Sequence, residues 1–135
     1  MIDKERITIW CEALESGIYQ QAIGKLKDGN GYCCLGVACE ISNLGEWTYS
    51  GEYSTDDGIT RFTLPLIVQN WYGLEHENPL VNLTSEEYAT FLVNYAKNHS
   101  TALTQNKSIN LTDLNDNGFT FTNIAAIIRR NFLGD

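Results

Sequence analysis

The chain of 135 residues has the length of a single domain, and 43% of its residues are hydrophobic, as is typical of a folded globular protein. It carries 9 basic and 17 acidic residues, for a formal net charge of −8. This charge argues against a protein that binds nucleic acid nonspecifically, because such binding depends on cations that neutralise phosphates.

The N-terminal residues contain no apolar run typical of a secretory signal. No later stretch reaches the roughly 18 to 20 apolar residues that a membrane-spanning helix needs. We therefore expect a cytoplasmic protein that does not bind a membrane. In a reducing compartment the four cysteines are expected to be free thiols rather than disulfides.

The first third of the chain predicts two helices with a hairpin between them. Residues 4–17 repeat apolar side chains at helical spacing, and Gly17 is typical of a helix end. Extended segments flank Asn30-Gly31, which favours a hairpin over 19–33. Small and apolar residues over 34–44 predict a buried second helix that ends at Gly45. The stripe expected on the first helix consists of Ile7, Trp10, Cys11, Leu14 and Ile18.

Aromatic residues on both sides of Asp56-Asp57-Gly58 predict a second hairpin over 46–63, because this tripeptide is a turn signal. Pro65 is expected in the first turn of a short helix. Residues 73–83 are expected to form a loop. The inner face of the short helix is expected to consist of Ile67, Val68 and Trp71.

The last third of the chain predicts two further helices. Thr84 and Glu87 have the spacing of a capping box, which begins a helix with the apolar stripe Tyr88, Phe91, Leu92 and Tyr95. Residues 98–110 are expected to be a polar loop, and 111–114 a single turn. The final helix is expected over 121–133. These elements predict an α+β fold: a helix-dominated single domain over 1–135 with small antiparallel β-hairpins.

The cysteine cluster at 33–39 is the densest group of potentially reactive side chains. A cysteine at a helix N-terminus can have a lowered pKa and act as a nucleophile. On that interpretation Cys34 is the nucleophile, and His76 or His99 is its base. The other interpretation, which we favour, is that these cysteines are small hydrophobic core residues.

No motif in the sequence predicts a metal or a cofactor. The cysteine spacing lacks the second pair that a structural zinc site needs. Residues 113–118 begin like a calcium-binding EF-hand loop, but Ile124 occupies the position of the bidentate glutamate. We interpret the segment as a turn, in which Asn115 and Asp116 remain candidates for contact with a ligand.

The glycine-rich segment 24–31 contains two lysines but lacks the spacing of a Walker phosphate-binding loop. It is expected to form a solvated hairpin tip. Its exposed amides and Lys25 are candidates for binding a small anion.

The predicted hairpin at 46–63 combines aromatic and acidic residues. Tyrosine and tryptophan dominate the energetics of protein interfaces, and alternation along a strand exposes about half of them. Candidate contacts for a basic partner protein are therefore Trp47, Tyr49 and Tyr53, and an acidic, aromatic face of this kind also suits mimicry of nucleic acid. The alternative is an ordinary solvated hairpin.

Three blocks of sequence resemble an uncharacterised family of small proteins encoded by bacteriophages and prophages. The first block spans residues 10–40 and includes the motif Tyr-Cys-Cys-Leu-Gly-Val-x-Cys at 32–39. The second block spans residues 64–79. The third spans residues 114–128 and begins with Leu-Asn-Asp-x-Gly. The resemblance implies a viral context and no particular activity. Residues 84–110 depart from the family pattern and are interpreted as an insertion.

Small size, acidity and the lack of a convincing catalytic set favour a non-enzymatic bacteriophage accessory protein. We expect it to bind and neutralise a host component, either a defence-system protein or a small nucleotide signal. A small-molecule pocket is expected at Tyr19, Gln21, Lys25, Trp71 and the Asn115-Asp116 turn. The alternatives are a cysteine-dependent hydrolase or transferase, and a virion structural subunit that forms a homo-oligomer.

Overall fold

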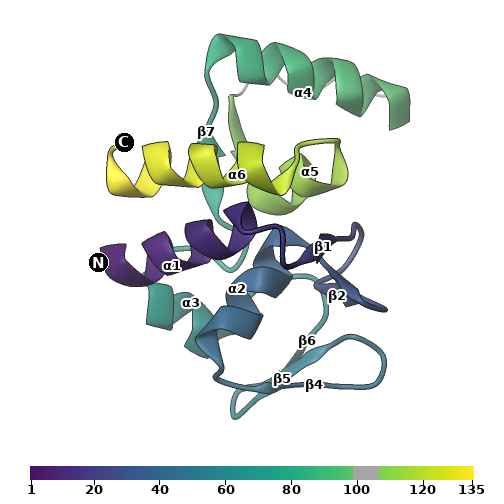
Figure 1. Ribbon diagram of the computed structural model, residues 1–135, viewed down its shortest axis with the longest axis vertical. Coiled ribbons are helices and arrows are strands. Elements are labelled where there is room, and N and C mark those ends of the chain that lie inside the picture. The colour runs from purple at the N-terminus through teal and green to yellow at the C-terminus, as the bar shows by residue number, and fades with distance from the viewer. Residues whose placement is uncertain (99–106) are drawn as a thin grey trace.

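The computed structural model describes residues 1–98 and 107–135 (Figure 1). The helices are α1 (Lys4–Glu15), α2 (Cys34–Ser42), α3 (Leu66–Tyr72), α4 (Ser85–Asn98), α5 (Leu111–Asp116) and α6 (Phe121–Ile128), which continues as a π-helix over Arg129–Leu133. The strands are β1 (Gln20–Gln21), β2 (Lys27–Asp28), β3 (Gly31–Tyr32), β4 (Glu46–Trp47), β5 (Tyr53–Thr55), β6 (Gly58–Thr60), β7 (Leu80–Asn82) and β8 (Ser108–Asn110). The predicted helix-dominated α+β class is confirmed.

Helices α1 and α6 run side by side in opposite directions, and α2 and α3 pack against α1 (Figure 1). The centre of the core is Trp10, which is fully buried and donates its indole N–H to the carbonyl of Cys34 at 3.0 Å. Tyr72 packs on this indole and donates its hydroxyl to the carbonyl of Ala38 at 2.6 Å. Both aromatic side chains therefore bury a large apolar surface without leaving a polar atom unpaired.

Helix α1 begins where predicted but ends earlier. Asp3 caps it by accepting a hydrogen bond from the amide of Arg6. Four residues of the predicted stripe are buried, whereas Ile18 lies beyond the helix and is 80% exposed. The prediction for Ile18 was wrong because the chain leaves helical geometry after Glu15, so helical spacing no longer directs its side chain.

Helix α2 is almost entirely buried, as its composition predicted. It ends at Asn43, which adopts a left-handed conformation with φ of 54°, and not at Gly45. Asparagine tolerates this conformation better than most residues. In α3, Pro65 is the N-cap rather than a residue of the first turn, and Val68 and Tyr72 are the buried residues.

The strands are short and form three small sheets. The predicted hairpin at 19–33 is present as β2 and β3, and β1 adds to β3 in parallel. Residues 46–63 form three antiparallel strands in the order β4-β5-β6, rather than the single predicted hairpin. The predicted loops at 73–83 and 98–110 contain β7 and β8, which pair antiparallel with each other. Their pairing joins distant segments, so no local turn signal announces it.

Helix α4 lies apart from α1 and packs over the α5–α6 side of the domain (Figure 1). The predicted capping box is confirmed: Glu87 donates its amide to Thr84, and Thr84 donates its amide to the Glu87 carboxylate. Phe91 is buried near Phe119, and Arg130 makes two hydrogen bonds to Glu87. Within the described residues, no helix is both long and apolar enough to span a membrane.

Replacement of Gly36 tests the packing of α2. A Cβ atom at this position would collide with the carbonyl oxygen of Leu26. A Gly-to-Ala change inside a helix ordinarily stabilises by about 0.5–1 kcal/mol. We expect Gly36→Ala instead to lower the free energy of unfolding by about 3 kcal/mol or more, because the backbone cannot give way cheaply.

Urea unfolding followed by circular dichroism measures this loss. Gly17→Ala is the control, since no atom lies within 4 Å of the position that its Cβ would take and only its φ of +78° opposes alanine. That change should cost about 1 kcal/mol. Equal stability of Gly36→Ala and the unmodified protein would contradict the packing described.

Candidate ligand-binding site

Two loops and one arginine form a pocket of about 250 Å³ on the β-rich side of the domain. One wall is the β2–β3 hairpin with the nearby Lys25, and the other is the loop between β4 and β5. We call this space the basic pocket. It is lined by Lys25, Lys27, Asp28, Gly29, Thr48, Tyr49, Ser50, Gly51 and Arg61.

Backbone contacts hold the two walls together. The Lys25 ammonium donates to the carbonyl of Ser50 at 3.3 Å and lies 3.9 Å from the Asp28 carboxylate. A Cβ atom at Gly51 would collide with the carbonyl of Lys27, so a glycine is needed for the loops to approach this closely. Gly51 also has a φ of +83°, which L side chains rarely adopt.

The cations of the basic pocket retain unused hydrogen-bond donors. The Nε of Arg61 lies 3.7 Å from the Glu52 carboxylate, and no side-chain nitrogen of Arg61 donates a hydrogen bond to another group in the described residues. The Lys27 ammonium lies 5.5 Å from the centre of the Tyr32 ring and 5.7 Å from that of Trp47. Such cation–π contacts hold an ammonium in place without consuming its donors.

The basic pocket is locally positive on an acidic protein. Lys25, Lys27 and Arg61 are three of the chain's nine basic residues, and two carboxylates, Asp28 and Glu52, lie beside them. One positive charge is left over, against −8 for the whole chain. Arginine and lysine residues in one lining suit a phosphate or another compact anion, because both side chains donate charge-assisted hydrogen bonds to oxygen.

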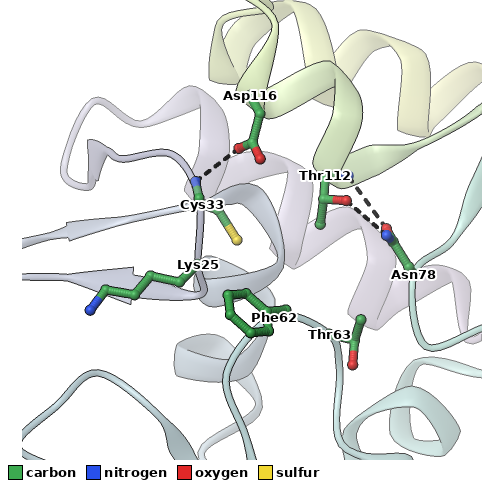
Figure 2. Close-up of a pocket in the computed structure, with 8 residues that line it drawn as sticks. Lys25, Cys33, Phe62, Thr63, Asn78, Thr112 and Asp116 are labelled. Atoms are coloured by element: carbon green, nitrogen blue, oxygen red, sulfur yellow. Dashed lines mark hydrogen bonds between the residues drawn. The ribbon is translucent and has the colours of Figure 1, made fainter.

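A second cavity, of about 130 Å³, lies beside the basic pocket, and Figure 2 shows its lining. We call it the Asp116 cavity. Lys25 lines both spaces, and its ammonium points away from Asp116 and Phe62 (Figure 2). The remaining lining residues are Gly24, Cys33, Phe62, Thr63, Asn78, Thr112 and Asp116.

Asp116 is held at this cavity by its neighbours. Its Oδ1 accepts a hydrogen bond from the amide of Gly24 at 3.1 Å and another from the Asn115 carboxamide at 3.3 Å. No group in the described residues donates to its Oδ2. Asp116 extends from α5 toward Cys33 and the Phe62 ring (Figure 2). The cavity therefore presents a carboxylate oxygen with spare acceptor capacity beside an exposed aromatic face.

The structure separates the residues predicted for a small-molecule pocket. Lys25 and Asp116 line cavities, as described above. Asn115 is buried and fully hydrogen-bonded, and Gln21 donates to it and to the carbonyl of Phe119, so these two side chains have structural roles. Tyr19 packs edge-on against Tyr32.

Trp71 lies elsewhere, on α3, beneath the Arg6 guanidinium. Its indole is 4.3 Å from that group, and its carbonyl accepts a hydrogen bond from it. Trp71 lines neither the basic pocket nor the Asp116 cavity, so the structure does not bring it together with Lys25.

The predicted aromatic face at 46–63 is only partly exposed. Tyr53 is 1% exposed and accepts a hydrogen bond from the Gly45 amide through its hydroxyl, which conflicts with a role in partner contact. Trp47 is half-buried against Tyr53 and donates to Glu40. Tyr49 is fully exposed and lines the basic pocket. Strand alternation points Tyr53 inward, and Trp47 is its cross-strand partner.

The cysteines are buried core residues, consistent with the interpretation that we favour. Burial raises the pKa of the Cys33 thiol to about 11 and that of Cys11 to about 12, and it raises the pKa of Cys34 and Cys39 well above the ordinary value. The Cys34 thiol donates to the carbonyl of Leu111. This is the opposite of the lowered pKa that a nucleophile needs.

The histidines do not complete a catalytic pair with Cys34 in the part of the chain that the structure describes. His76 is exposed beside a separate apolar groove with Met1 and Phe132, and His99 lies outside the described residues. Within residues 1–98 and 107–135, no three His, Cys, Asp or Glu side chains come together in a way that could hold a metal ion.

Sequence reasoning missed several residues of both spaces. Arg61 was overlooked because it stands alone among acidic residues, although a lone arginine in an acidic segment is itself a signal. Lys25 lies in the bend before β2 and Lys27 in the strand itself, so no strand periodicity indicates that both residues line one pocket. Phe62, Thr63, Asn78 and Thr112 carry no local signal, since the fold alone brings them to Asp116.

The fold and its two adjoining spaces define a small α+β domain with a polar, partly basic surface recess. The model of the family described as "Domain of unknown function (DUF8296)" matches residues 3–132, and the chain belongs to this family. No curated protein and no solved structure matches the chain.

The buried thiols generate a prediction for chemical labelling. We expect no cysteine of the folded protein to react quickly with iodoacetamide at pH 7, because each thiol is buried and its pKa is raised above 9.0. Addition of denaturant should make all four react. Mass spectrometry over time measures the extent of labelling.

The same shifts give the pH dependence of stability. In the unfolded chain the thiols lose their protons near pH 9.0, whereas in the folded protein Cys33 keeps its proton up to about pH 11. Protonated thiols are therefore no obstacle to folding below pH 9, and stability is lost as the pH rises from about 9 toward 11 and beyond. The free energy of unfolding should therefore decrease above about pH 9. In the labelling experiment described above, rapid reaction of one cysteine at pH 7 would contradict the burial of that thiol and restore its interpretation as a nucleophile.

Proposed function

We propose that the protein is a non-catalytic, bacteriophage-encoded accessory protein that captures a small nucleotide signal of its host. By holding the signal it lowers the free concentration and so neutralises the response that the signal triggers. The basic pocket binds the phosphates of this ligand. No chemical step is required, since sequestration follows from mass action alone.

The observation that carries this proposal is the convergence of Lys25, Lys27 and Arg61 on one pocket of an acidic protein. Elsewhere, Arg129 and Arg130 are committed to close ion pairs with Glu15 and Glu87, at 2.7 and 2.6 Å. The ion pairs at the basic pocket are longer, at 3.9 and 3.7 Å. An incoming phosphate can therefore recruit these cations without first breaking strong bonds.

Tyr49 adds a second recognition element. Its ring is fully exposed at the edge of the basic pocket, where it is available to cover a bound ligand. At this position the ring can pack against the nucleoside part of a ligand whose phosphates lie in the basic pocket. A phosphorylated ligand with an aromatic part suits this combination better than a simple anion does.

Pyrophosphate is the simplest probe of the basic pocket. We expect Arg61→Ala to weaken pyrophosphate binding about tenfold, because hydrogen bonds to a charged group contribute roughly 1.5–3 kcal/mol and the arginine is partly solvated. Isothermal titration calorimetry at low ionic strength measures the dissociation constant. The affinity should also fall as salt is added.

Lys4→Ala is the matched control, since it removes one positive charge from the exposed start of α1, outside the pocket. It should leave pyrophosphate binding within about twofold, apart from the long-range effect of net charge. Absence of pyrophosphate binding, or equal weakening by both substitutions, would contradict the proposal.

A host protein is the second candidate for the captured component. The observation in its favour is a group of exposed apolar side chains on and beside the β4-β5-β6 sheet: Tyr49, Ile59 and Phe62. They lie among acidic residues, which suits a basic partner. Because Tyr53 and Trp47 stabilise the sheet itself, Tyr49 is the better residue to replace.

We expect Tyr49→Ala to reduce capture of a host protein from bacterial lysate at least about tenfold if this second candidate is correct, because exposed tyrosines contribute strongly to interfaces. Quantitative mass spectrometry of the captured material measures the effect. Capture that is unchanged by Tyr49→Ala would exclude this face as the interface.

A further inference from the structure

The basic pocket and the Asp116 cavity are neighbours along two chain segments. Lys25 lines both spaces, while Arg61 lines the first and the next residue, Phe62, lines the second. The amide of Leu26 donates to the carbonyl of Arg61 at 2.8 Å, which ties the two segments side by side. Successive Cα atoms are about 3.8 Å apart, so one small molecule can reach both spaces.

The sizes of the two spaces also favour a shared ligand. The basic pocket measures about 250 Å³ and the Asp116 cavity about 130 Å³. Sites for small molecules and cofactors are typically ~300–1,000 Å³. Neither space reaches that range alone, whereas both together do.

The chemistry of the Asp116 cavity differs from that of the basic pocket. Its carboxylate accepts hydrogen bonds, and the Lys25 ammonium does not point toward it (Figure 2). Phe62 lines this cavity and is 55% exposed, which leaves part of its ring available for stacking. This combination suits a flat, donor-bearing group, which is the description of a nucleobase.

We infer that one nucleoside phosphate occupies both spaces, with its phosphates in the basic pocket and its base in the Asp116 cavity. The inference rests on the proposed function and names the part of the ligand that gives specificity. The base stacks on Phe62 and donates to the Oδ2 of Asp116.

Guanine is the base that fits a carboxylate best. Its ring N–H and exocyclic amino group are adjacent donors, so a carboxylate meets no repelling acceptor between them. Adenine and cytosine each place a ring acceptor next to their amino group, which would face the negative charge. Asn78 and Thr112 also line the Asp116 cavity, and the Asn78 carboxamide donates to the Thr112 hydroxyl at 2.7 Å. The second amide hydrogen of Asn78 remains available for a carbonyl oxygen of the base.

The experiment compares GDP, IDP and pyrophosphate by calorimetry. IDP lacks only the exocyclic amino group of GDP, and pyrophosphate lacks the whole nucleoside. We expect GDP to bind about tenfold more tightly than IDP, and both to bind more tightly than pyrophosphate. Asp116→Asn should reduce the preference for GDP over IDP to about twofold or less, because an amide oxygen replaces the carboxylate.

Phe62→Ala provides an independent variant on the surface, where misfolding is not expected. It should weaken GDP binding about tenfold through loss of stacking, and pyrophosphate binding should not change. Leu66→Ala is the matched control, because this side chain is 58% exposed at the start of α3 and lines neither space. It should leave the affinity for GDP within about twofold.

The outcomes separate this inference from the proposed function. Pyrophosphate binding that depends on Arg61, combined with GDP affinity that is insensitive to Phe62 and Asp116, would overturn only the base site. GDP affinity equal to that of pyrophosphate would do the same. Failure of all three ligands to bind would overturn both the base site and the proposed function.

Discussion

The carboxamide of Asn115 is the contact on which the arrangement of the two spaces depends. This side chain is 2% exposed, and its Oδ1 accepts hydrogen bonds from the Cys34 amide at 3.1 Å and from Gln21 at 2.9 Å. Its Nδ2 donates to the carbonyl of Ala22 at 2.8 Å. One buried amide thus joins α5, the start of α2 and the strand β1. Burial of such a polar group is tolerated only because its hydrogen bonds are made.

The consequences of this junction extend to the surface. Asp116 follows Asn115 and is thereby directed toward Gly24, whose amide donates to its carboxylate. The start of α2 is held against Leu26, close enough that Gly36 cannot carry a side chain, and Leu26 is hydrogen-bonded to Arg61. The buried amide therefore helps to set the position of the Asp116 carboxylate and, through Leu26, that of the Arg61 backbone. A binding surface built this way is preorganised and loses little conformational entropy when a ligand arrives.

Charge distribution explains why an acidic protein can carry an anion-binding pocket. The C-terminal arginines pair with Glu15 and Glu87 and thereby fasten the last helix to α1 and α4. The cations left near the β-sheets are held by cation–π contacts and long ion pairs, and these are weak interactions at a solvated surface. Salt screens the interaction between exposed charges that are more than about 10 Å apart. The charges next to the pocket, rather than the net charge of the protein, therefore decide which ligand is attracted there.

Local sequence signals determined the helices: the stripe of α1, the capping box at Thr84 and the apolar run of α2 each involve residues within a few positions of one another. They also identified Lys25, Tyr49 and Asp116 as candidates for ligand contact, and favoured the cysteines as core residues. Only the tertiary structure decided which candidates meet. The pairing of β7 with β8 and the approach of Arg61 to Lys25 join segments that lie far apart in the chain. Such contacts depend on which surfaces the packed helices leave open, and no local periodicity encodes that.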